Sequence, residues 1–300
     1  MKKLISSVFL AFLGISLMAQ ALVNIKLNLE KGKVYTVKNT GKQTMQIDAG
    51  GQQFNMDVFS NNVVTYKVLK QENDVMDIEF KFDTIASKTV SPMMNKEINS
   101  AKPAGNDPME ILMNKMSTYS IIAKISTTGK FINFVNYGKF KDSVLFVLDS
   151  IPATKRDQAK TMADVILKES AIRTLIEPLF AYLPETAVKI GDTWETTYTL
   201  AANNTSLLSF NTFTLTGIEK SVANVSGKSE IESLPSIDPA AQMTQALKGN
   251  MTSEGTIDVA TGLMLKNTSK GQIEGTMTMK ANNTEMKIKL DSESETIMLK

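Results

Sequence analysis

From Gly32 onward, hydrophobic and polar residues alternate along the chain with a period of two. In the segment GKVYTVKNT, Tyr35 and Val37 would point to one side of an extended strand, and Thr36 and Lys38 to the other. The segments FNMDVFS, VVTYKVLK and VMDIEFKFDTI continue the alternation, with the turn sequences AGG and QEND among them. This pattern predicts antiparallel strands joined by hairpin turns.

One break in the alternation, at residues 92–106, is rich in Pro, Asn and Gly and is predicted to be a loop. A helix is expected directly after it, with Asp107 as N-cap, Pro108 at the first position and Glu110 completing a capping box. Its apolar face, with the spacing i, i+3, i+4 and i+7, would consist of Met109, Leu112, Met113 and Met116.

A block of helices is predicted over residues 138–182, with Thr154 and Ser170 as candidate N-caps. The helix after Thr154 would place on one face Ala159, Met162, Ala163 and Ile166. Strands are predicted again over residues 192–300. Only residues 238–248, which begin with Asp-Pro, are expected to interrupt these strands as a helix.

The two strand-rich sections resemble each other. Gly32-x-x-Tyr35 opens the first and Gly191-x-x-Trp194 opens the second, and each section later contains a Thr-Gly turn. A diverged duplication and two independent series of hairpins both explain the likeness.

We expect an α+β fold, in which one large curved antiparallel sheet, shaped like a half-barrel, carries a central helical block on one face. The domain organisation would be a signal peptide over residues 1–21 and a single β-rich domain over 22–300. This domain would contain a first sheet section (32–137), the helical block (138–182) and a second sheet section (192–300).

The first residues are typical of a secretory signal peptide. Two lysines precede an apolar run from Val8 to Met18, and Ala19-Gln20-Ala21 fits the small-x-small cleavage rule. We therefore expect a secreted or periplasmic protein, cleaved near Ala21. No later segment is long and apolar enough for a transmembrane anchor, and without Cys there is no lipid anchor.

The chain has no His and no Cys, which excludes Ser-His-Asp and Cys-His catalysis, disulfides and typical zinc sites. Lys and Arg number 33 against 31 Asp and Glu, and loss of Lys2 and Lys3 with the signal peptide would leave 31 of each. A nucleic-acid-binding protein would normally show a basic excess. We expect no metal, no cofactor, no nucleic-acid partner and no enzymatic activity.

Carboxylates two residues apart in a strand lie on the same side, as Asp77 and Glu79 would, and also Glu293 and Glu295. Paired carboxylates can hydrolyse glycosides, so a hydrolase is a third hypothesis. Solvated strand faces are the ordinary place for such residues.

Methionine is in excess, with 18 residues, several of them on predicted helix faces. Methionine fills irregular gaps in cores and also suits adaptable apolar binding surfaces. If helices laid across a curved sheet leave an apolar cavity, the candidate ligand-binding residues are Met109, Leu112, Met113, Met116, Met162 and Ile166.

The segment LPETAVKIGDTWE carries a family resemblance. Its residues Leu183-Pro184, Val188, Gly191-Asp192 and Trp194, before a β-rich half that contains IDVATGLMLK, resemble a family of secreted Bacteroidota proteins of unknown function. The Pro-x(n)-Val-Lys-x-Gly-Asp-Thr-Trp segment is the most specific element. More distantly, the layout resembles periplasmic half-barrel carriers of lipoproteins or lipids, and the lack of a lipid-anchor Cys differs from the lipid-anchored members of that group.

The leading hypothesis is a non-enzymatic, monomeric protein that binds a lipid, an acyl chain or another apolar molecule between sheet and helices. The alternative is a structural or protein-interaction module of the cell envelope without a ligand cavity.

Overall fold

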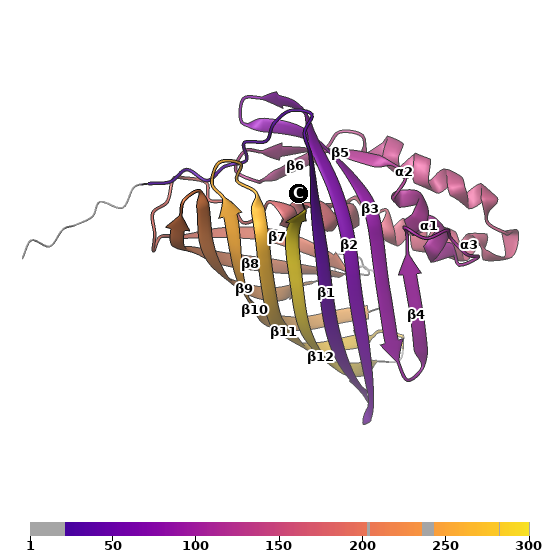
Figure 1. Cartoon of the computed structure of the whole chain (residues 1–300). Coiled ribbons are helices and arrows are strands. Elements are labelled where there is room, and N and C mark those ends of the chain that lie inside the picture. The colour runs from indigo at the N-terminus through magenta and orange to yellow at the C-terminus, as the bar shows by residue number, and fades with distance from the viewer. Residues whose placement is uncertain (1–21, 203–204, 236–242, 282, 300) are drawn as a thin grey trace, which may run out of the picture.

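A computed structural model of the chain describes residues 22–202, 205–235, 243–281 and 283–299 (Figure 1). The first half of the chain contributes the strands β1 (Val34–Ala49), β2 (Gln52–Glu72), β3 (Val75–Ser91), β4 (Met94–Asn99), β5 (Ser120–Ser126) and β6 (Phe131–Phe134). The second half contributes β7 (Thr193–Ala202), β8 (Thr205–Glu219), β9 (Val222–Leu234), β10 (Met243–Asp258), β11 (Met264–Met279) and β12 (Thr284–Leu299).

All these strands belong to one antiparallel sheet of 12 strands. Its order is β6-β5-β3-β2-β1-β12-β11-β10-β9-β8-β7, with β4 paired to β3 beside β5. The sheet bends so strongly that β1–β3 stand in front of β7–β9 in Figure 1. The prediction of a large curved antiparallel sheet with helices is confirmed.

The main core lies on the concave face of this sheet, at the end where β1 begins. Alternate residues point inward, so Tyr35, Tyr66 and Phe80 are buried while their neighbours in sequence face outward. The Tyr35 ring stacks on that of Tyr66, with centroids 5.7 Å apart. The rings of Tyr66 and Phe80 meet that of Phe180, at 5.4 and 6.1 Å.

A strap formed by residues 22–31 crosses the same end of the sheet. It buries Ile25, Leu27 and Leu29, and its backbone pairs with Val188 at one point. The Leu27 and Asn28 amides donate to carbonyls of the two Thr-Gly turns. The strap therefore closes the end of the sheet that holds the core.

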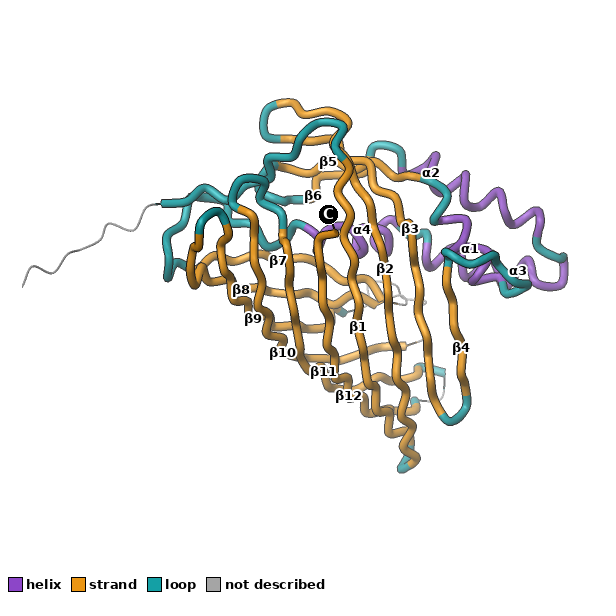
Figure 2. Tube along the Cα trace, in the orientation of Figure 1, coloured by secondary structure: helices purple, strands orange, loops and turns teal. Residues whose placement is uncertain are grey.

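The helices are α1 (Pro108–Met116), α2 (Tyr137–Leu145), α3 (Ala153–Ile166) and α4 (Glu169–Ile176), with 3₁₀ turns η1 (Phe146–Ser150) and η2 (Glu177–Leu179). Figure 2 shows α4 inside the bend of the sheet and the other helices beside β4. Helix α4 bridges the two edge strands. The Arg173 guanidinium lies 4.8 Å from the Phe131 ring centre on β6, and the Thr174 hydroxyl donates to the Thr199 carbonyl of β7.

The segment from Leu183 to Trp194 connects the last helical turn to β7. Gly191 adopts a left-handed φ of 92° that other residues reach with difficulty, and Asp192 accepts a hydrogen bond from the Lys189 amide at this turn. The Trp194 indole donates to the Tyr182 carbonyl at 2.9 Å. This segment therefore joins helix to sheet and anchors β7 on the core.

Two element predictions were wrong. Part of the expected loop 92–106 forms β4, because β3 extends past β5 and leaves an open edge that β4 pairs with. In the expected helix 238–248, residues 243–248 begin β10, and the rest lies outside the described residues. Thr244 and Leu247 face opposite sides there, so their helical spacing was a coincidence.

Helix starts were predicted correctly only for α1. Asp107 caps it through the amides of Met109 and Glu110. Helices α3 and α4 each begin two residues earlier than N-caps at Thr154 and Ser170 would require, so both residues lie inside the helices. Neither helix has a side-chain hydrogen bond at its N-cap.

Candidate functional site

Beyond the main core, the concave face becomes polar. The strand register aligns a row of small residues across β2, β1, β12, β11, β10 and β9. This row, called the polar belt below, consists of Ser60, Gly41, Ser294, Ser269, Ser253 and Gly227. The Ser269 and Ser294 hydroxyls lie 2.8 Å apart, and in the adjacent row Asn39 donates to Thr296 at 2.8 Å.

Past the polar belt the concave face becomes apolar again. Two further rows, called the distal trough below, cross the same strands. One row consists of Met56, Met45, Leu290, Ile273, Gly249 and Ile231. The next consists of Phe54, Ile47, Ile288, Gly275 and Leu247.

The distal trough is separate from the main core. Ile231, Ile273 and Ile288 are 3%, 6% and 8% exposed, yet they do not belong to the main buried cluster. Met45 and Leu290 beside them are only half-buried. The helices pack against β3, β4, β5 and β7 instead, so apolar surface remains accessible in the trough.

Inward-facing glycines allow the sheet to bend here. A Cβ on Gly249 would lie 2.3 Å from the Gln272 carbonyl oxygen, and one on Gly271 would lie 2.4 Å from that of Asn250. The missing side chains let β10 and β11 approach on the inside of the curve, as glycine does at sheet bends. The trough is therefore a consequence of glycine positions as well as of apolar ones.

Throughout the described parts of β1–β3 and β7–β12, no charged side chain faces the concave side. The register places the lysines and carboxylates of these strands at the outward positions, as in β12, where Lys289 and Glu293 alternate with Leu290 and Ser292. Across these strands the concave face is thus uncharged from the polar belt to the far ends of the strands.

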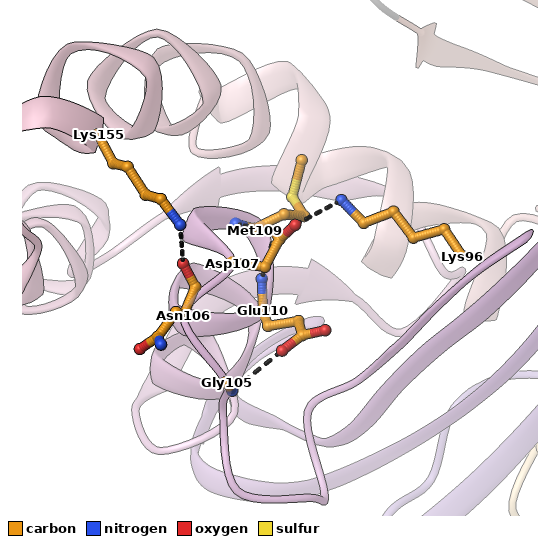
Figure 3. Close-up of polar contacts among 7 residues, drawn as sticks. All are labelled: Lys96, Gly105, Asn106, Asp107, Met109, Glu110 and Lys155. Atoms are coloured by element: carbon orange, nitrogen blue, oxygen red, sulfur yellow. Dashed lines mark hydrogen bonds and ion pairs between the residues drawn. The ribbon is translucent and has the colours of Figure 1, made fainter. Parts of the chain in front are cut away.

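At one rim of the concave face, Lys96 of β4 pairs inward opposite Thr89 and forms an ion pair with Asp107 at 2.8 Å (Figure 3). Burial raises the pKa of Asp107, but the Lys96 ammonium and two backbone amides outweigh it, so this pKa lies below its ordinary value.

In the same junction, Glu110 accepts from the Gly105 amide, and Lys155 of α3 donates to the Asn106 carbonyl (Figure 3).

At the other rim, the Arg173 guanidinium of α4 donates two hydrogen bonds to Glu177, at 2.6 and 2.7 Å. The Glu177 carboxylate is buried near Tyr198. Burial raises the pKa of the Tyr198 hydroxyl, and the Glu177 charge raises it further. Ser209 and Asn211 complete a buried polar cluster, with their side-chain oxygens 2.9 Å apart.

The residues proposed from the sequence lie elsewhere. Leu112 and Met116 are fully buried in the main core, and Met113, Met162 and Ile166 pack against it. Met109 is half-buried at the start of α1. That any of them contacts a ligand stays a prediction. Sequence reasoning missed the trough residues, whose signal was the uncharged alternate positions of the long strands.

The two predicted pairs of carboxylates are not pairs of isolated acids, because lysines form ion pairs with their members. Asp77 accepts from Lys124 at 2.7 Å and Glu79 pairs with Lys67 at 2.9 Å, all on the outer face. Glu295 pairs with Lys266 at 2.9 Å. Each is an ordinary cross-strand ion pair on a solvated surface.

The outer face contains an open groove of about 770 Å³ across β1, β12, β11, β10 and β9. Its rims are outward-facing side chains, among them Lys42, Lys228, Lys270, Glu254, Glu293 and Glu295. Three lysines balance three glutamates, so the groove has no net charge to attract an ionic ligand.

In the segments that the structure describes, no helix is long and apolar enough to cross a membrane. Nor do three or more His, Cys, Asp or Glu side chains of these segments gather as ligands for a metal ion.

The profile of a family of unknown function, DUF6263, matches residues 73–264. No curated protein matches the chain. Among solved structures, the COG4313 outer membrane channel from Pseudomonas putida F1 aligns over 91% of this chain and 97% of its own, with 8% identity and a TM-score of 0.27.

Two further structures align as weakly. OccK5 (OpdH) from Pseudomonas aeruginosa covers 90% of this chain and 99% of its own, with 6% identity and a TM-score of 0.25. A DUF1329 family protein from Desulfovibrio piger covers 85% and 83%, with 8% identity and a TM-score of 0.12. Likenesses of this size carry no conclusion about this chain.

Proposed function

Because the chain belongs to DUF6263, a family of unknown function, we propose its function from geometry: it binds the acyl chain of a lipid in the distal trough, without catalysis. The observation that carries the proposal is the half-buried apolar surface of Met45, Leu290 and their row, outside the main core. Each methylene of a ligand that this surface removes from water would contribute about 0.8 kcal/mol.

The sequence supports the rest of the proposal. A chain without His or Cys lacks the usual nucleophile and base machinery. Its first 21 residues have the layout of a signal peptide, so we place the protein outside the cytoplasm, as a carrier or receptor for apolar molecules.

The test is binding of the apolar fluorophore 1-N-phenylnaphthylamine, compared between variants of two adjacent residues on opposite faces of β1. Met45→Lys places an unpaired charge in the trough and should weaken binding by about tenfold or more. Gln46→Lys adds the same side chain to the exposed outer face and should leave binding unchanged.

Native mass spectrometry of protein purified from its own host should show co-purified lipid. A clean apo mass, together with no fluorophore binding by the wild-type protein, would refute the proposal. That result would favour the alternative of an interaction module that uses only the outer surface.

A further inference from the structure

The absence of charge on the concave side of the described parts of β1–β3 and β7–β12 restricts what the trough can hold. A carboxylate, phosphate or ammonium group inside would find no counter-charge on β1–β3 or β7–β12. The charges at the rims already have partners, Lys96 with Asp107 and Arg173 with Glu177. Moving an ionised group from water to such a site without a partner is strongly unfavourable.

One polar side chain in the row next to the distal trough has an unsatisfied hydrogen-bond donor. Gln245 of β10 faces inward, directly opposite Met277 of β11 and between Met243 and Leu247 of its own strand. Its backbone is fixed, because Ser233 donates to the Gln245 carbonyl and accepts from the Leu247 amide.

The Gln245 side-chain nitrogen is buried and has no hydrogen-bond acceptor among the residues that the structure describes. Buried donors in folded proteins nearly always have an acceptor, and an unmade bond is costly. An acceptor brought by a ligand would satisfy this nitrogen where the surrounding side chains are apolar.

We propose that the trough selects an uncharged lipid whose ester or amide carbonyl accepts a hydrogen bond from Gln245. This inference rests on the proposed function and adds the class of ligand: a neutral carbonyl-bearing amphiphile in place of a fatty acid or a cationic lipid. The apolar rows of the trough bind the alkyl chain of the lipid. Gln245 fixes the position of the lipid carbonyl along the trough.

The test uses the full mature chain and three molecules with a saturated chain of twelve carbons: methyl laurate, laurate and dodecyltrimethylammonium. Their affinities are measured at pH 8 by displacement of 1-N-phenylnaphthylamine. Methyl laurate should bind at least about tenfold more tightly than either ion, because only the ions must lose their hydration without gaining a partner. Equal or tighter binding of laurate or of the cation would overturn the inference.

Two variants examine Gln245 itself. Gln245→Met keeps the volume and removes the donor, so affinity for methyl laurate should fall about three- to tenfold, as expected for one neutral hydrogen bond. Thr244→Met, on the exposed outer side of β10, should leave it unchanged. Gln245→Lys should reverse the order of preference, because laurate would then meet an ammonium group.

The outcomes separate the two proposals. If the fluorophore does not bind the wild-type chain at all, the trough itself is refuted. If it binds and Gln245→Met behaves as the wild type toward methyl laurate, only the role of Gln245 is refuted. Circular dichroism of each variant excludes misfolding as the cause of a loss.

Discussion

Asp107 ties the helical block to the rim of the sheet, since one carboxylate caps α1 and pairs with Lys96 of β4. Its pKa is lower in the folded chain than its ordinary value of 3.8. Because the folded-state pKa is the lower one, the stabilisation that the Asp107 carboxylate gives is complete above the unfolded-state pKa. It is lost as the pH falls through the lower native pKa.

Asp107→Ala should therefore lower the free energy of unfolding by about 1 kcal/mol at pH 7, as is typical for loss of an N-cap. Urea denaturation at pH 7 and at progressively lower pH measures it. The difference from wild type should shrink below pH 3.8, where the native carboxylate itself becomes protonated. A deficit that is unchanged at low pH would contradict the assignment.

Tyr182 is a second residue whose side chain has a structural role. Its buried hydroxyl donates to the Gly262 carbonyl at 2.9 Å and accepts from the Met264 amide at 2.7 Å. Burial raises the pKa of this hydroxyl well above its ordinary value, so it stays neutral.

Tyr182→Phe should cost about 1–3 kcal/mol, because the Met264 amide loses its acceptor in a buried site. Tyr119→Phe, after α1 and away from this turn, is the matched control. Thermal and urea denaturation of both variants provide the measurement, and equal stability of the two would show that the hydroxyl contributes nothing.

At the scale of elements, the bend of β10 and β11 depends on glycines at concave positions. Gly249→Ala should destabilise the chain by about 1–3 kcal/mol, since the new methyl overlaps the Gln272 backbone and the two strands must separate. Gly138→Ala is the opposite case, because this helical glycine in α2 has nothing within 4 Å.

That control should gain up to about 1 kcal/mol from helix propensity. Urea denaturation compares the two alanines. If Gly249→Ala were as stable as wild type, the proposed origin of the curvature would be wrong.

The alternation of residues was enough to predict the strands and the curved sheet, because a period of two is imposed by the pleat itself. It was not enough to predict β4, whose pairing depends on the edge of β3 that β5 leaves free. Nor could it locate the site. The apolar positions of one strand become a trough only when the register aligns Met45 with Leu290 and Leu290 with Ile273, and register is a property of the folded sheet.

At the scale of the whole molecule, the two halves repeat one layout. Thr128-Gly129 joins β5 to β6 and Thr261-Gly262 joins β10 to β11, both glycines with left-handed φ. Each glycine lies against the backbone of another segment, Phe180 in one case and Lys26 in the other. The strand orders β6-β5-β3-β2-β1 and β11-β10-β9-β8-β7 also correspond.

Strand β12 lies between these halves and is hydrogen-bonded to β1 on one side and to β11 on the other. Ser294→Pro should abolish cooperative unfolding, because proline in a central strand removes a ladder hydrogen bond and obstructs the pairing. Ser294→Ala should fold normally. Circular dichroism during heating distinguishes them, and a normal transition for the proline variant would contradict the central role of β12.

The position of β12 also determines the order in which the molecule can be assembled. Every strand has at least one sheet neighbour close to it in sequence, β1 in β2 and β12 in β11, but the pairing of β1 with β12 spans almost the whole chain. Before β12 is synthesised, the two halves would form separate sheets in which β1 and β11 are unpaired edge strands. The 16 residues of β12, made after all the other strands, are those that join them.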